Sequence, residues 1–242
     1  AIGYPLDLAA AAGRAVGEAH RSTRDLAGEA PAALPWALFA LDRDGPAAFA
    51  WSEAPLRAVL EGLAEPERFV AALEAARAAW RPECLVHGDL KWDNCLVADG
   101  DGGAPTVLVV DWESAGVGDP AWDVAGIVQE YLGYAALMGL EVSRARFATA
   151  MEIGGIAPLV DALRAFFDAY AGAAAVPVRA ERDALAVRAV RLAGARLVQT
   201  GLEHASRDGE RNDASASLAA LAPAMLSEPE ALASHLGLAE GR

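Results

Sequence analysis

Apolar residues recur every three or four positions over most of the chain. Positions 8, 12, 16 and 19 follow this spacing, and they predict an amphipathic helix from Pro5 to Arg21. The same pattern predicts helices at residues 66–80, 159–170 and 179–200, and two short helices near 218–225 and 232–236. Asp119, followed by Pro120, is a typical helix start, and it predicts a further helix that runs to about Leu137.

Three short runs rich in β-branched residues lie between these helices, at 84–87, 94–97 and 106–112. The second and third are separated by the turn-forming sequence ADGDGGAP, which predicts a β-hairpin. No internal repeat interrupts the pattern. We therefore expect an α+β fold that is predominantly α-helical, with one small strand element, in a single unit that spans residues 1–242.

Composition narrows the class of protein. The chain has 242 residues, of which 54% are hydrophobic, so it can bury a sizeable core. Its net charge of −14 disfavours nucleic-acid binding, and no apolar run reaches the ~18 residues of a membrane span. The two cysteines, Cys84 and Cys95, fit core thiols in a reducing compartment. We expect a cytoplasmic protein with no membrane and no nucleic-acid partner.

One segment, residues 87–123, carries half of the chain's net negative charge, −7 of −14. It holds eight carboxylates against a single cation, Lys91, which is also the chain's only lysine. Such a density beside apolar strands calls for a counter-ion. Mg²⁺ prefers one or two carboxylate or amide oxygens and keeps its other positions for water and phosphate. Asn94 and Asp111 are the natural pair, because Asp111 ends the strand that returns beside the loop of Asn94.

Asp89 then remains free for chemistry at the same loop. It precedes Asn94 by five residues and can orient a hydroxyl nucleophile, while Lys91 on the same side can meet a transferred phosphoryl group. Phosphoryl transfer needs little more than positioning and charge neutralisation. The pattern indicates a metal-assisted phosphotransferase.

Three sequence blocks strengthen this interpretation: HGDLKWDN at 87–94, DWE at 111–113 and GDPAWD at 118–123. Together, in this order and spacing, they resemble the aminoglycoside phosphotransferase and choline kinase branch of the protein-kinase-like fold. The resemblance implies that Asp89 is the catalytic aspartate and that Asn94 and Asp111 hold Mg²⁺ for ATP or GTP. It also implies that His87 and Asp123 support the catalytic loop. Lys91 departs from many antibiotic kinases and is shared with Ser/Thr protein kinases.

The chain lacks two features that the resemblance would lead us to expect. Kinases of this type carry an N-terminal lobe with a glycine-rich strand turn and an ATP-binding lysine, and neither occurs here. We therefore expect residues 1–242 to form a C-terminal, catalytic lobe, with the N-terminal lobe supplied by upstream sequence or by a partner chain. Glu113 is open between support of Asp111 and a substrate contact.

Several alternatives remain open. The acceptor is either a small molecule, such as an aminoglycoside-like or choline-like metabolite, or a Ser/Thr hydroxyl of a precursor peptide in natural-product maturation. A non-catalytic scaffold would explain the missing ATP lysine, and a metal-dependent hydrolase could use the same carboxylates.

Other residues receive structural interpretations. The proline-rich connection from Trp36 to Trp51 either lines a substrate cleft or packs onto the domain. The arginines of the helix at 179–200 could bind an anionic substrate, but we expect them to pair in solvent with Glu181 and Asp183. His20 is expected to be a packed residue at a helix end.

Overall fold

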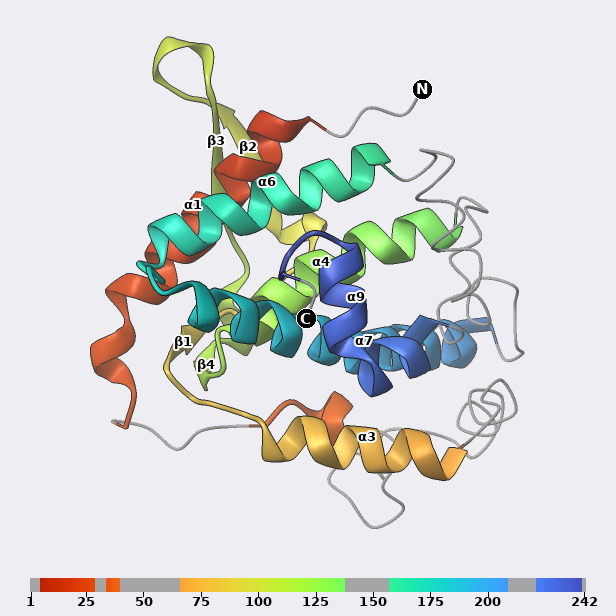
Figure 1. The fold of residues 1–242 in the computed structure, drawn as a ribbon. Helices are drawn as coiled ribbons and strands as arrows, with labels where there is room; N and C mark the ends of the chain where they lie inside the picture. Colours follow the sequence, from red (N-terminus) through yellow and green to blue (C-terminus); the bar gives the residue numbers. More distant parts are fainter. Residues whose placement is uncertain (1–4, 29–33, 40–65, 138–156, 209–220, 241–242) are drawn as a thin grey trace.

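A computed structural model describes residues 5–28, 34–39, 66–137, 157–208 and 221–240 (Figure 1). This part of the chain is mostly helical and contains two small antiparallel strand pairs, so the predicted α+β class is confirmed. None of its helices is both long and apolar enough to cross a membrane. Residues 40–51 of the proline-rich connection, including Trp51, lie outside the described residues, as do residues 218–220 at the start of a predicted short helix.

Helices α1 (Leu6–Ser22) and α6 (Ala157–Ala173) pack side by side along their length (Figure 1). Two glycines of α1, one turn apart, permit the close approach. A Cβ atom at Gly13 would overlap the carbonyl oxygen of Phe166, and one at Gly17 would lie 2.6 Å from the carbonyl oxygen of Tyr170. The backbones of the two helices are therefore in direct contact, which fixes their relative position.

Helix α4 (Ala121–Leu137) runs through the centre of the molecule. All nine residues from Ala121 to Gln129 are buried, as expected for a helix that is apolar on every side. It packs against α7 (Arg179–Asp208), which is also covered by α9 (Pro229–His235). Helix α3 (Pro66–Ala78) lies at the edge of the molecule (Figure 1).

The strands form two separate ladders. Strand β1 (Cys84–Val86) pairs with β4 (Gly116–Gly118), and β2 (Cys95–Asp99) pairs with β3 (Pro105–Val109) in the predicted hairpin. The β2–β3 hairpin projects beside α1, and one of its faces carries the cross-strand pair Leu96 and Leu108, whose exposed fractions are 52% and 53%.

Three expectations need correction. The third strand ends at Val109 and not at Trp112, because Asp111 adopts a left-handed conformation with φ 66° and begins the 3₁₀ turn η5 (Trp112–Ser114). Strand β4 follows this turn and was not predicted, since GVG is too short and too rich in glycine for a strand signal. Helix α7 extends eight residues beyond Thr200. Both cysteines are free, as expected.

Candidate active site

The loop at residues 87–94 connects β1 to β2 and ends in the 3₁₀ turn η3 (Trp92–Asn94). Asp89 lies near its middle with 38% of its side chain exposed. Lys91 Nζ donates a hydrogen bond of 2.6 Å to Asp89 Oδ2, and this bond raises the pKa of Lys91 above its usual value. Arg196 Nη2 lies 3.8 Å from Asp89 Oδ1. The carboxylate therefore faces two cations and still has one oxygen open to a ligand.

His87 forms hydrogen bonds with two backbone groups, one inside the loop and one in the segment before Asp111. Its Nε2 lies 2.8 Å from the carbonyl oxygen of Val110, which can only accept, so Nε2 carries the proton. The backbone N–H of Asp89 donates to His87 Nδ1 over 3.2 Å, so this nitrogen is the acceptor. These two bonds define a neutral tautomer. They tie the loop of Asp89 to the segment that leads into Asp111.

Asp123, in the first turn of α4, accepts the backbone N–H groups of His87 at 2.6 Å and Gly88 at 3.1 Å. His20 Nε2 lies 3.0 Å from the same carboxylate, and His20 Nδ1 lies 2.9 Å from the hydroxyl of Tyr170. Burial opposes ionisation of Asp123, yet the hydrogen bonds from His20 and the loop backbone outweigh it and lower its pKa. A buried carboxylate thus holds the start of the loop.

Asn94 and Asp111 come together at the base of the hairpin. The backbone N–H of Val110 donates to the carbonyl oxygen of Asn94 over 3.0 Å, which sets Asp111 beside Asn94. Asn94 is buried, and its Nδ2 donates to the carbonyl oxygen of Asp89 at 2.9 Å. Its amide oxygen and the exposed Asp111 carboxylate accept no hydrogen bond from the described residues. This donor set, one amide and one carboxylate oxygen, fits Mg²⁺.

No group of three or more His, Cys, Asp or Glu side chains in the described ranges is arranged to hold a metal. Glu113 is exposed on η5, and within the described part of the chain it forms no hydrogen bond or ion pair with Asp111 or with the loop.

A cavity of about 230 Å³ opens beside Asp89. Three tryptophans line it, one from each of three segments: Trp36 from η2 (Trp36–Phe39), Trp80 from the end of α3 and Trp122 from α4. The buried Nε1 of Trp80 has no hydrogen-bond partner among the described residues. Trp36 packs on the core, and it also lines this cavity.

Comparison with known proteins agrees with this geometry. The model of the phosphotransferase enzyme family (APH) matches residues 4–150, which is more than half of the chain. The chain belongs to the phosphotransferase enzyme family. Viomycin phosphotransferase from Streptomyces vinaceus is 41% identical over 70 residues, which make up 29% of this chain. The match spans only 24% of that relative's length. The predicted resemblance to this family is confirmed.

The sequence interpretation missed one residue that contacts the loop, Arg196 of α7. It is buried, and its guanidinium donates to the carbonyl oxygens of Leu90 at 3.0 Å and Gly88 at 3.4 Å. It also lies over the ring of Trp122, 4.9 Å from the centroid, and burial lowers its pKa. The signal was present, because Arg196 falls within the apolar stripe of α7, at helical spacing from Ala193.

The expected pairing of the α7 arginines with Glu181 and Asp183 is wrong. Their partners come from other elements, because α7 is enclosed by them: Arg182 pairs with Asp168, Arg191 with Glu230, and Arg179 with Glu240. Arg188 binds Asp119 through Nε at 3.2 Å and Nη2 at 3.3 Å.

Asp119 also does more than start a helix. It does accept the N–H of Ala121 at 2.9 Å, as an N-terminal cap should, but it is fully buried and also accepts the N–H of Arg81 at 3.0 Å. His20 was rightly expected to be packed at a helix end. Its link to Asp123, 103 residues away, has no local sequence signal.

Proposed function

We propose that this chain is the catalytic lobe of an ATP- and Mg²⁺-dependent kinase that phosphorylates a hydroxyl group of a small molecule. Family membership supports phosphoryl transfer as the reaction class. The observation that carries the assignment to these residues is the placement of Asp89. Its carboxylate lies at the wall of a cavity, in a braced loop, five residues before a free amide oxygen and beside Lys91.

Asp89 orients the acceptor hydroxyl with the carboxylate oxygen that Lys91 does not bind. The hydroxyl oxygen attacks the terminal phosphorus as its proton passes to Asp89, and the bond from phosphorus to the bridging oxygen of the nucleotide breaks. Lys91 keeps its charge, since its bond to Asp89 raises its pKa, and it stabilises the charge on the transferred group. In phosphoryl transfer, positioning of the hydroxyl contributes more than proton abstraction.

Asn94 Oδ1 and the Asp111 carboxylate would hold the metal. Bound Mg²⁺ supplies charge neutralisation on the nucleotide phosphates and orients them. Within this chain, His87 keeps the two ligand segments in register through its bonds to Asp89 and Val110. Arg196 and Asp123 hold the loop backbone between them.

The nucleotide side requires a further lobe, from upstream sequence or a partner chain. The exposed Leu96 and Leu108 pair supports this, because it lies on the hairpin that Asn94 precedes and Asp111 follows. An apolar face next to the nucleotide phosphates is where such a lobe would pack. Viomycin joins choline and an aminoglycoside as candidate acceptors because of the relative's name.

The test is phosphate transfer from [γ-³²P]ATP to each of these acceptors, with the protein expressed from its complete reading frame. Asp89→Asn should lower kcat by about 10²-fold or more while the protein stays folded, since the side chain is partly exposed. Asp99→Asn removes the same charge from the exposed hairpin and should leave kcat unchanged. Equal turnover by the Asp89→Asn variant and the wild type would refute the proposal.

A further inference from the structure

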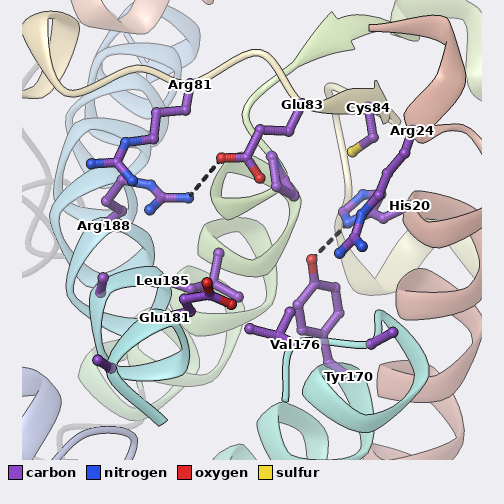
Figure 2. A pocket seen from close by; sticks show the side chains of 14 residues that line it. His20, Arg24, Arg81, Glu83, Cys84, Tyr170, Val176, Glu181, Leu185 and Arg188 are labelled. Atoms are coloured by element: carbon purple, nitrogen blue, oxygen red, sulfur yellow. Dashed lines mark hydrogen bonds and ion pairs between the residues drawn. The ribbon is translucent and has the colours of Figure 1, made fainter. Parts of the chain in front are cut away.

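A second and larger cavity, of about 450 Å³, lies between α1, α6 and the first half of α7 (Figure 2). It shares no lining residue with the cavity beside Asp89. Its volume falls within the range of sites that bind small molecules. His20 and Tyr170 face this cavity and also brace Asp123, but the proposed phosphoryl transfer uses none of the charged side chains that line it, so the space needs a separate explanation.

Arginines stand on opposite walls of the cavity. Figure 2 shows Arg81 and Arg188 on one side and Arg24, with His20 and Tyr170, on the other. Guanidinium groups bind carboxylates and phosphates through paired hydrogen bonds. A chain with net charge −14 thus places three of its cations around one hollow.

The three arginines differ in how far they are already engaged. Arg188 is committed to Asp119, and Arg24 Nη2 donates to the carbonyl oxygen of Ala174 at 2.6 Å. The side chain of Arg81 forms no recorded hydrogen bond or ion pair with the described part of the chain. Arg81 therefore offers a complete set of donors to a ligand, and Arg24 offers those that Ala174 does not use.

Three carboxylates lie around the same cavity. Arg188 pairs with Asp119 and, at 3.9 Å, with Glu83, which leaves Arg24 and Arg81 facing Glu181. These last three groups are all solvent-exposed, so water screens them alike. Burial raises the pKa of the Cys84 thiol to about 12, so the thiol adds no negative charge. Leu185 and Val176 supply apolar surface between the charged walls (Figure 2).

We infer that this cavity is a second ligand site, which binds a small organic anion. The anionic group, a carboxylate or a phosphate monoester, lies between Arg81 and Arg24, and its carbon skeleton packs on Leu185 and Val176. The ligand is distinct from nucleotide and acceptor, which bind at the loop of Asp89.

The test is calorimetric titration of the protein with succinate and, separately, with glycerol 3-phosphate, in buffer free of nucleotide and divalent metal. We expect saturable binding of one of these at one site per chain, and the one that binds identifies the anionic group. Arg81→Gln should weaken that binding at least tenfold. The side chain has no described partner to lose, so the fold should be unaffected, and circular dichroism checks this.

Two control variants locate the site. Arg21→Gln removes the same charge from an exposed position on α1 that does not line the cavity, and it should change the affinity less than twofold. Lys91→Gln removes the cation beside Asp89 and should also have little effect. No saturable binding of either anion at millimolar concentration would overturn the inference. So would equal losses in the Arg81 and Arg21 variants, or a loss confined to the Lys91 variant. Because nucleotide is absent, these outcomes do not depend on the proposed kinase activity.

Discussion

The loop that carries Asp89 and the turn that carries Asp111 lie side by side, but the protein holds them in different ways. Buried groups hold the loop: Asp123 binds its backbone N–H groups, and Arg196 binds its carbonyl oxygens. The carboxylate of Asp111 is exposed, and its backbone adopts a left-handed conformation that non-glycine residues rarely take.

The difference suggests a division of labour. A group that must orient a hydroxyl gains from a rigid position fixed before the substrate arrives. A group that coordinates a cation can be completed by the cation, its water molecules and the nucleotide phosphates. On this account, buried contacts hold the loop of Asp89, where the acceptor would bind (the acceptor side). The position of the Asp111 carboxylate (the metal side) would be set by the metal and nucleotide that it binds. The following variants test that contrast.

The largest effect is expected at Asp123. Asp123→Ala leaves His20 and two backbone N–H groups without their buried acceptor, which should lower the free energy of unfolding by roughly 3–5 kcal/mol. Asp111→Ala, at an exposed position, should cost about 1 kcal/mol or less. Urea denaturation of both variants measures the difference. Similar losses in the two would remove the basis of the comparison.

Arg196 should follow. Replacement by methionine keeps much of the side-chain volume but removes the donors to Gly88, Leu90 and Gln129, at a cost of about 2–3 kcal/mol. Arg191→Met is the matched control on the same helix, where the lost contact is a 3.7 Å ion pair with Glu230. We expect the control to lose about 1 kcal/mol at most. Thermal unfolding of the two proteins in parallel would show whether the loop contacts of Arg196 stabilise the fold more than the ion pair of Arg191 does.

Gly88, in the loop of Asp89, lies against the turn that follows Asp111. Its φ is +84°, and a Cβ there would overlap the carbonyl oxygen of Ser114, in the turn after Asp111. Gly88→Ala should therefore cost about 1–3 kcal/mol and displace the turn. At Gly116 a Cβ would meet nothing within 4 Å, so Gly116→Ala should be nearly neutral. An Asp111 amide resonance that shifts in the Gly116 variant but not in the Gly88 variant would contradict this.

A smaller effect is expected from pH. The pKa of Asp123 is lower in the folded protein than its ordinary value near 3.8. The folded state therefore binds fewer protons than the unfolded state below that value. The stabilisation from Asp123 is fully present above about pH 3.8 and is lost as pH falls through the folded pKa. The gap in stability between wild type and Asp123→Asn should accordingly narrow below pH 4, and a gap that widens there would reverse the assignment.

How far the sequence could predict this site depended on the range of each interaction. Helix positions followed from apolar spacing, and the loop residues followed from three motifs, because both signals are local. The burial of Arg196 had a local signal, its place in the apolar stripe of α7, which was overlooked. The brace from His20 to Asp123 joins residues 103 positions apart, and no short pattern encodes it. Strand β4 was missed for a related reason: three residues pair only because β1 lies beside them.

The shortening of β3 has a different origin. Apolar character continues through Val110 to Trp112, but backbone hydrogen bonding to Asn94 ends the ladder and Asp111 turns the chain. Asp111, which we propose as a metal ligand, interrupts the regular pattern there. The catalytic and metal-binding roles of the loop residues remain predictions of the geometry and the family.

The most direct test of the account is Mg²⁺-dependent nucleotide affinity, measured calorimetrically for wild type, Asp111→Asn and Asp89→Asn in the protein expressed from its complete reading frame. The account predicts that Asp111→Asn weakens ATP binding at least tenfold in the presence of Mg²⁺ but not in its absence. Asp89→Asn should bind Mg·ATP as the wild type does. Unchanged Mg·ATP affinity in the Asp111 variant, or an equal loss in the Asp89 variant, would contradict the division between a metal side and an acceptor side.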